Sequence, residues 1–276
     1  MHPDPILSFS LFGTEINIYL YGVCIAVGLL ACIGVFFLYS KKANMPQKIQ
    51  DFTFFVAIVA IAFGFLFSKL FQAVYDWIET GKFDFYGSGI TAMGGFVGGA
   101  ITFLVVYFSA GRYMFKGEDR ALYKKELNTT FCIAPISITI AHAFGRIGCL
   151  MAGCCYGMES DSGFTLHIHG ADRIPVQLYE SLFLFALFGV LSFLYFKRSN
   201  ITMHIYLIAY GIWRIIIEFF RVDARGAVIL GLAPSQWQSI IFILTGVILF
   251  IVYAVKKVPF TRKIRESETP TAPEKE

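Results

Sequence analysis

Seven long apolar stretches dominate this sequence of 276 residues, and they constrain its fold more than any other feature. They lie at about residues 17–39, 52–78, 88–110, 129–150, 176–196, 202–220 and 235–255. A membrane-spanning helix needs about 20 apolar residues, and only helices or closed barrels cross a bilayer. Barrel strands alternate apolar and polar residues, whereas these stretches do not. We therefore expect an all-α polytopic membrane protein with seven transmembrane helices.

The composition agrees with a membrane protein. Charged residues make up 15% of the chain, well below the roughly 25% of a typical soluble domain. The first apolar stretch is too long for a cleaved signal peptide, and no lysine or arginine precedes it. We therefore expect this stretch to stay in the protein as a transmembrane helix.

The distribution of lysine and arginine predicts the orientation of the helices. Most of the 23 basic residues follow the first, third, fifth and seventh stretches. Cytoplasmic loops carry the excess of basic residues, so the N-terminus is expected outside and the C-terminus in the cytoplasm. The net charge of +4 therefore needs no nucleic-acid partner to explain it.

The domain organisation is expected to be simple. Residues 1–258 are predicted to form a single transmembrane domain with a catalytic cavity at its outer face. Residues 259–276 are charged and rich in proline and threonine, which predicts a disordered cytoplasmic tail. The inverted repeats typical of transporters are not evident.

Polar stretches interrupt the apolar ones at the predicted outer ends of six helices. Polar groups that are far apart in sequence are therefore expected at the same depth, in the outer half of the membrane. This indicates a cavity at that depth. These stretches are residues 21–22, 91–100, 141–157, 175–181, 210–223 and 234–239.

The sixth stretch carries four polar residues on one helical face. Tyr210, Arg214, Glu218 and Arg221 follow one another at spacings of four, four and three. The two arginines flank one glutamate and leave a surplus positive charge. The pattern fits either a structural ion-pair ladder or an anion site, and the planar fork of arginine suits phosphate.

Arg146 supplies another positive charge near the end of the fourth stretch. A charge near the bilayer centre costs roughly 2.5–3.5 kcal/mol on insertion scales, so this arginine either reaches toward water or forms part of a site. The neighbouring Gly145, Gly148 and Gly153 permit close backbone approach, which favours a site.

The third stretch opens with a glycine run, Gly94 and Gly95 followed four residues later by Gly98 and Gly99. Small residues at this spacing favour close helix packing. Contact with a lipid headgroup is the alternative for this run.

Three cysteines lie close together near the predicted outer, oxidising side: Cys149, Cys154 and Cys155. Their spacing matches no strong zinc pattern, so packing or a disulfide is favoured. A metal site that includes His142, His167 or His169 and a direct catalytic role are the alternatives. On this ranking we expect no metal and no cofactor.

Five motifs occur in order along the chain: Tyr-Gly at 21–22, Gly-Gly-x-x-Gly-Gly at 94–99, Gly-Arg-x-Gly at 145–148, Gln-x-Tyr-Glu at 177–180 and Tyr-Gly-x-x-Arg-x-x-x-Glu-Phe-x-Arg at 210–221. In this order the chain resembles the prolipoprotein diacylglyceryl transferase family over about residues 15–255. The resemblance implies a multi-pass enzyme of the bacterial inner membrane. It would move a diacylglyceryl group from phosphatidylglycerol to the lipobox cysteine of a prolipoprotein signal peptide, and form a thioether and glycerol phosphate.

The resemblance also implies roles for individual residues. Arg146 and Arg214 match the family's essential arginines, and Glu218 and Arg221 match their ion-pair partners. With Glu180 as a candidate base, the expected catalytic residues are Arg146, Arg214, Glu218 and Glu180. The expected substrate-binding residues are Tyr21, Gly94, Gly95, Gly98, Gly145, Gly148, Gly157, Gln177, Tyr179, Tyr210 and Arg221.

The sequence departs from the family pattern at several positions. Cys149, Ala152 and Cys154 replace two asparagines and a glutamate of the family signature, and Met93 stands where a histidine often precedes the glycine run. The general base cannot be a histidine at position 93. Glu180 is the favoured base, or the arginine field alone favours the thiolate.

Two other function classes fit parts of the sequence. A transporter or flippase of an anionic lipid would use the same arginines. A thiol redox protein would use Cys149, Cys154 and Cys155 and would have no need of Arg214. The transferase explains all five ordered motifs and is the expected function, with phosphatidylglycerol, the prolipoprotein and membrane lipids as partners.

Overall fold

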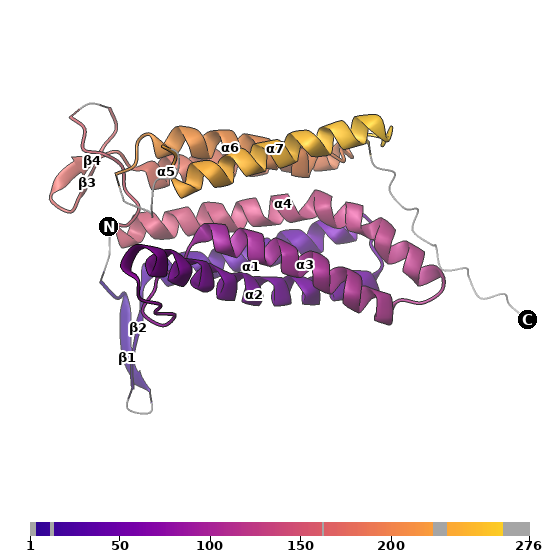
Figure 1. Cartoon of the computed structure of the whole chain (residues 1–276), viewed down its shortest axis with the longest axis horizontal. Coiled ribbons are helices and arrows are strands. Elements are labelled where there is room, and N and C mark those ends of the chain that lie inside the picture. The colour runs from indigo at the N-terminus through magenta and orange to yellow at the C-terminus, as the bar shows by residue number, and fades with distance from the viewer. Residues whose placement is uncertain (1–3, 12–13, 162, 223–230, 262–276) are drawn as a thin grey trace, which may run out of the picture.

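Long helices form the body of the protein in the computed structural model, which describes residues 4–11, 14–161, 163–222 and 231–261. In this part of the chain each predicted apolar stretch overlaps one helix, so the helical prediction is confirmed. The helices are α1 (Leu20–Lys42), α2 (Gln47–Thr80), α3 (Ala92–Met114), α4 (Glu118–Ala152), α5 (Val176–Phe196), α6 (Thr202–Glu218) and α7 (Pro234–Val255) (Figure 1).

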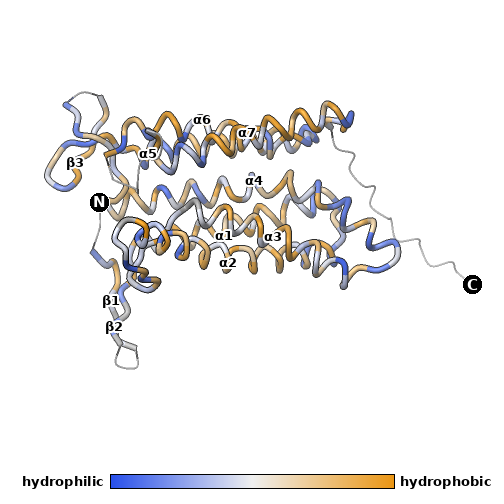
Figure 2. Tube along the Cα trace, in the orientation of Figure 1, coloured by the Kyte–Doolittle hydropathy of each residue, from blue (hydrophilic) through white to orange (hydrophobic). Residues whose placement is uncertain are grey.

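Six of these helices, all except α6, are long and apolar enough to cross a membrane. Figure 2 shows long apolar segments along the helices and hydrophilic segments at both ends of the bundle. The polytopic membrane prediction is therefore confirmed. Helix α6 has 17 residues and reaches about 26 Å, so the count of seven spans stays a prediction, as does the orientation of the termini.

Two short β-hairpins accompany the helices, and neither was predicted. Strands β1 (Leu7–Leu11) and β2 (Thr14–Ile18) pair antiparallel before α1. Strands β3 (Leu166–Ile168) and β4 (Ala171–Arg173) pair antiparallel between α4 and α5. The sequence Leu-Ser-Phe-Ser-Leu of β1 alternates apolar and polar residues, a strand signal that the neighbouring apolar stretch obscures.

Helix α4 lies in the middle of the bundle, between a layer of α1, α2 and α3 and a layer of α5, α6 and α7 (Figure 1). It packs along α1 on one side and α5 on the other, while α2 packs on α3 and α6 on α7. Buried side chains such as Ile136, Leu184 and Tyr206 form a core among α4, α5 and α6. This central position explains how residues of α4 reach partners on two other helices.

The two ends of the bundle differ in chemistry. Both hairpins, the start of α1 and the end of α4 lie at one end, shown on the left of Figure 1. The basic loops lie at the other end, where Nζ of Lys48 and the Asp119 carboxylate form a 3.0 Å ion pair. Residues 262–276 of the predicted disordered tail lie outside the described residues, whereas Pro259 accepts a 2.9 Å hydrogen bond from the Asn200 side chain.

Candidate active site

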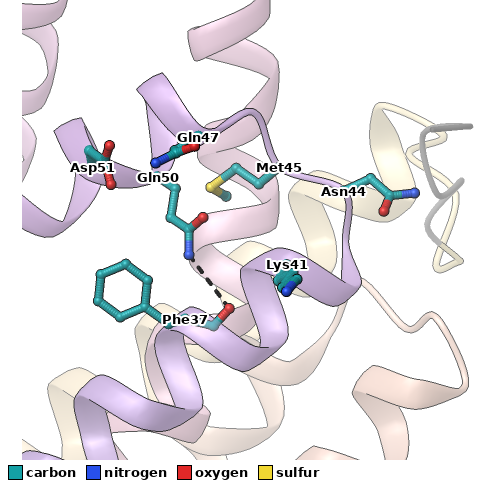
Figure 3. A pocket seen from close by; sticks show the side chains of 7 residues that line it. All are labelled: Phe37, Lys41, Asn44, Met45, Gln47, Gln50 and Asp51. Atoms are coloured by element: carbon teal, nitrogen blue, oxygen red, sulfur yellow. Dashed lines mark hydrogen bonds between the residues drawn. The ribbon is translucent and has the colours of Figure 1, made fainter. Parts of the chain in front are cut away.

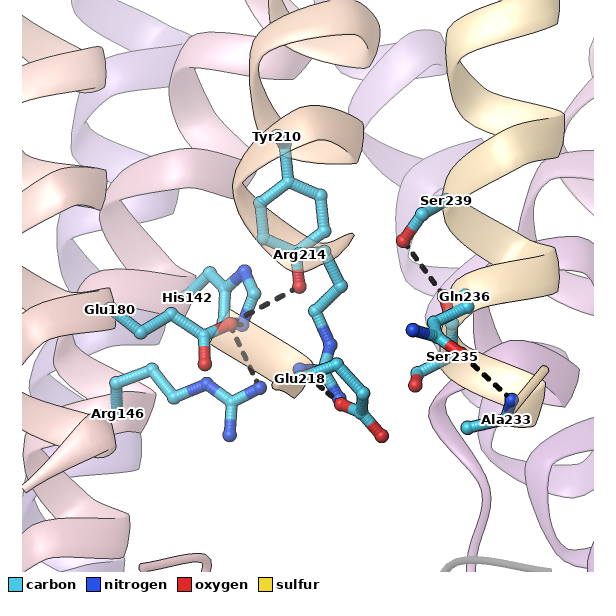
Figure 4. A network of polar contacts seen from close by, with 10 residues as sticks. All are labelled: His142, Arg146, Glu180, Tyr210, Arg214, Glu218, Ala233, Ser235, Gln236 and Ser239. Carbon is cyan, nitrogen blue, oxygen red and sulfur yellow. Dashed lines mark hydrogen bonds and ion pairs between the residues drawn. The ribbon is translucent and has the colours of Figure 1, made fainter. Parts of the chain in front are cut away.

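Six polar side chains from three helices meet near the end of the bundle that carries the hairpins (Figure 4). Side chains four residues apart share one helical face, and this spacing recurs within α4 and within α6. The six are His142 and Arg146 of α4, Glu180 of α5, and Tyr210, Arg214 and Glu218 of α6.

Glu180 lies at the centre of this cluster, and its side chain has no exposed surface. Its Oε1 atom accepts a hydrogen bond from the Tyr210 hydroxyl at 3.3 Å and lies 3.0 Å from Nη2 of Arg146. The Nε2 atom of His142 is 3.7 Å from the same oxygen. An unpaired buried charge costs several kcal/mol, so Arg146 is the partner that allows this carboxylate to be buried.

Arg214 and Glu218 form a second ion pair one helical turn apart. Nη1 of Arg214 lies 2.8 Å from Oε2 of Glu218, and Arg214 is only 7% exposed. Arg214 also interacts electrostatically with Glu180, so the two pairs belong to one cluster. Arg221 lies just beyond α6, where its backbone forms a β-bridge with Gly157.

Two buried atoms of the first ion pair lack a hydrogen-bond partner among the described residues. These are Nε of Arg146 and Oε2 of Glu180. A buried polar atom without a partner costs roughly 1–3 kcal/mol. The cluster therefore offers a hydrogen-bond donor and an acceptor in its interior, beside two guanidinium groups that suit a phosphate.

The predicted glycines fall into two groups. A Cβ atom at Gly98 would lie 2.3 Å from Cβ of Phe67, and one at Gly94 would lie 2.7 Å from the Phe67 carbonyl oxygen. These glycines, with Gly95 beside Ser68, allow α3 to pack closely on α2. A role for them in substrate binding stays a prediction.

Three further glycines lie closer to the cluster. Gly148 packs against Tyr21, whose Cδ2 would be 3.2 Å from an added Cβ. Gly157 fits between the carbonyl oxygens of Ile174 and Phe220, each 2.7 Å from an added Cβ. Gly145, by contrast, has no described atom within 4 Å of its Cβ position, so it is the one of the three that faces open space.

The remaining predicted residues contact the loop between α4 and α5. Gln177 is fully buried, and its side chain donates to the Cys154 carbonyl oxygen. The Tyr179 hydroxyl donates to the Phe164 carbonyl oxygen at 3.4 Å. At the start of α7, the Gln236 side chain accepts a 3.0 Å hydrogen bond from the Ala233 N–H, which caps that helix. These residues hold loops and helix ends beside the cluster.

His142 was considered in the sequence only as a metal ligand, yet it lies inside the cluster. Its ring meets Tyr210 edge-on at 5.3 Å between centroids. It precedes Arg146 by four residues, so the helical spacing places the two side chains on one face. This spacing of four residues is the sequence feature that could have placed His142 in the cluster.

A separate pocket of about 520 Å³ lies at the opposite, basic end of the bundle. It is lined by the end of α1 and the start of α2, including Phe37, Lys41 and Asp51 (Figure 3). The Gln50 side chain crosses it to donate a 3.5 Å hydrogen bond to the Phe37 carbonyl oxygen. None of the six clustered side chains lines this pocket.

Comparison with known proteins gives a consistent result. A family model described as prolipoprotein diacylglyceryl transferase matches residues 7–252. The phosphatidylglycerol–prolipoprotein diacylglyceryl transferase of Clostridium tetani is 34% identical and aligns over 92% of this chain and 99% of its own length. Transferase 2 of Clostridium perfringens is 31% identical over 90% of this chain and 94% of its own. A Dehalococcoides mccartyi relative with the same name is 30% identical over 95% and 97%.

Proposed function

The chain belongs to the prolipoprotein diacylglyceryl transferase family, and from this we propose that the buried arginine–glutamate cluster is its catalytic centre. The protein transfers the diacylglyceryl group of phosphatidylglycerol to a prolipoprotein in lipoprotein maturation. The acceptor in this proposal is the thiol of the lipobox cysteine in the signal peptide. One observation carries the assignment: two arginines of one cluster, Arg146 and Arg214, are each held by a glutamate.

The reaction needs stabilisation of a phosphate that leaves. The acceptor sulfur attacks the glycerol carbon next to the phosphate, a C–S bond forms, and the C–O bond breaks. The oxygen leaves with the phosphate as glycerol phosphate, which gains one negative charge while the thiol loses one proton. Donors aimed in advance at the developing charge lower the barrier most. Arg146 and Arg214 are placed to act as this phosphate clamp, with Glu218 orienting Arg214.

Glu180 serves this reaction best as a positioning group. Its Oε1 atom is occupied by Arg146 and Tyr210, so the carboxylate fixes the arginine in the interior. Its Oε2 atom lacks a partner among the described residues and can accept a hydrogen bond from substrate. The proton of the thiol then passes to the leaving phosphate. Tyr21, Gly145 and Gln177 are proposed to line the substrate site around the cluster.

The basic loops support an outward-facing site in the bacterial inner membrane. Lysine and arginine collect at the end of the bundle opposite the cluster, beside the Lys48–Asp119 ion pair. By the positive-inside rule this end faces the cytoplasm, which directs the cluster, the N-terminus and both hairpins outward. All seven helices, α6 included, span the membrane in this proposal.

The test is a reaction of purified protein in detergent with phosphatidylglycerol and a lipobox peptide. Mass spectrometry should detect the peptide with an added diacylglyceryl group, together with released glycerol phosphate. A serine peptide should stay unmodified. Removing one transition-state donor typically costs about 100- to 1,000-fold in rate, and we expect this loss for Arg146→Ala and for Arg214→Ala.

Arg112→Ala is the matched control, because Arg112 is an exposed arginine in the last turn of α3, and α3 ends at the opposite end of the bundle. It should keep the wild-type rate. Near-normal turnover by both cluster variants, at equal amounts of folded protein, would show that the arginines are structural. Movement of phosphatidylglycerol across proteoliposomes without any modified peptide would favour a flippase instead.

A further inference from the structure

Three cysteines next to the catalytic cluster bring their sulfur atoms together. The Sγ atoms of Cys149, Cys154 and Cys155 all lie within 4.8 Å of one another. Cys149 lies in the last turn of α4, three residues after Arg146. All six cysteines of the chain are outside disulfides, so the three sulfurs meet as thiols.

The end of helix α4 explains how these side chains come together. The Cys154 N–H donates to the Cys149 carbonyl oxygen at 3.1 Å, and the Gly153 N–H donates to the Leu150 carbonyl oxygen at 3.2 Å. With Gly153 at φ +69°, these two bonds form a Schellman motif, which juxtaposes the side chains of the residues at the Cys149 and Cys154 positions. Apolar side chains usually meet there, and here two thiols do.

The third thiol requires an unusual backbone conformation. Cys155 has φ +61°, in the left-handed region that residues other than glycine rarely adopt. Holding such a residue there costs on the order of 1–3 kcal/mol, and this persists only where the surroundings impose it. This backbone conformation places the sulfur of Cys155 beside the other two.

Hydrogen bonds hold the turn that carries these thiols. Gln177 of α5 donates to the Cys154 carbonyl oxygen, and Nε2 of His169 lies 2.9 Å from the Gly153 carbonyl oxygen. The Gly157 N–H donates to the Ile174 carbonyl oxygen at 2.9 Å. Contacts within the protein therefore fix the turn that carries the three thiols.

We propose that Cys149, Cys154 and Cys155 bind one thiophilic metal ion, such as Zn²⁺, through three thiolates. Zinc–sulfur bonds of about 2.3 Å in tetrahedral geometry separate sulfurs by about 3.8 Å, which small side-chain rotations can reach from the observed arrangement. A disulfide would use two of the three sulfurs and leave the third unused. Cys154 is exposed, so the fourth metal position is open to solvent.

The spacing of the cysteines alone favoured packing or a disulfide over a metal site. The metal site is proposed instead because the Schellman turn brings the Cys-x4-Cys-Cys sulfurs together. Binding releases three protons and gives a complex with one net negative charge, close to Arg146, which interacts electrostatically with Cys149 and Cys155. Helices α4 and α5 carry both the turn and the catalytic pair, so the metal is expected to fix the positions of Arg146 and Glu180.

The experiment measures metal binding directly, so its result is independent of whether the protein transfers diacylglyceryl groups. Wild-type protein is purified with reductant, stripped of metal and titrated with Cd²⁺ while the thiolate charge-transfer absorbance is recorded. Zn²⁺ content is measured after equilibration and gel filtration. We expect one Cd²⁺ per chain in the titration and one Zn²⁺ per chain in the separate Zn²⁺ experiment. Binding of either metal should weaken as the pH falls, because the ligands must be deprotonated.

Variants then assign the ligands. Cys149→Ser, Cys154→Ser and Cys155→Ser should each weaken binding at least tenfold, and the triple variant should abolish the charge-transfer band. Cys32→Ser in α1 is the matched control and should bind like wild type. Less than 0.2 equivalents of either metal in the folded wild type, or full binding by the triple variant, would overturn the proposal. So would protein whose Cys149, Cys154 or Cys155 is oxidised to a disulfide that persists in the presence of the metal.

Discussion

Arg146 and Glu180 form an ion pair between α4 and α5, with Nη2 of the arginine 3.0 Å from Oε1 of the glutamate. The arginine side chain is 12% exposed and the glutamate side chain is fully buried. Each charge therefore depends on the other for its stability in the interior. This dependence distinguishes the pair from surface ion pairs, which typically contribute about 0–1 kcal/mol.

We predict that Glu180→Gln lowers both the stability and the activity of the protein. Breaking a buried pair by removing one partner typically costs about 3–5 kcal/mol, since it leaves the Arg146 charge uncompensated. Thermal unfolding in detergent should show a clear fall in melting temperature. The double variant Arg146→Gln with Glu180→Gln should recover part of the stability and none of the activity.

The control for this prediction is Glu159→Gln. Glu159 pairs with Arg173 at 2.6 Å, but its side chain is 64% exposed, so its loss should change the melting temperature little. Equal melting temperatures for wild type and Glu180→Gln would contradict the buried-pair account.

Arg214→Lys should impair catalysis although it keeps the positive charge. The planar guanidinium of arginine can bind a phosphate with two parallel hydrogen bonds while it also faces Glu218. Lysine lacks this planar group. Glu218→Gln should reduce the rate less than Arg214→Ala does if Glu218 only orients the arginine. Turnover rates with phosphatidylglycerol and a lipobox peptide measure both effects. A rate for Glu218→Gln as low as that for Arg214→Ala would instead indicate proton transfer by Glu218.

Gly98→Ala and Gly145→Ala should separate packing from substrate contact. The added methyl group of Gly98→Ala would overlap the Phe67 side chain, with a Cβ–Cβ distance of 2.3 Å. Overpacking of this kind costs about 1–3 kcal/mol, so the melting temperature should fall. The added methyl group of Gly145→Ala meets no described atom within 4 Å. The melting temperature of this variant should stay the same or rise, because alanine favours a helix by about 1 kcal/mol over glycine.

The activity of Gly145→Ala then reports on substrate approach. If substrate approaches the backbone beside Arg146, the methyl group should lower turnover while the protein stays folded. Gly34→Ala is the matched control, because Gly34 also lies in a helix with no described atom near its Cβ position. Full activity of Gly145→Ala would remove Gly145 from the substrate site.

Cysteine labelling should establish the orientation in the membrane. Thr80 ends α2 and Glu118 begins α4, so these positions lie at opposite ends of the bundle (Figure 1). In a background without other cysteines, a membrane-impermeant reagent should label Thr80→Cys in intact cells. It should label Glu118→Cys only after the membrane is opened. The reverse pattern would place the proposed catalytic cluster on the cytoplasmic side.

The helices and most of the residues of the cluster could be predicted from the sequence. A bilayer admits few structures, so apolar runs of about 20 residues predict helices directly. The spacing of four between Arg214 and Glu218 likewise predicts a shared helical face, where the structure has a 2.8 Å ion pair. Both inferences depend only on interactions along one helix.

The contacts between helices depend on how the helices pack together. Glu180 pairs with Arg146 because the packing of α5 on α4 brings together two residues that are far apart in sequence. The same packing places His142 beside Glu180, while the turn after α4 gathers Cys149, Cys154 and Cys155. Periodicity specifies which side chains share a face of one helix. The partner on a second helix follows from how the side chains of the two helices pack together, and that information is spread over the whole interface.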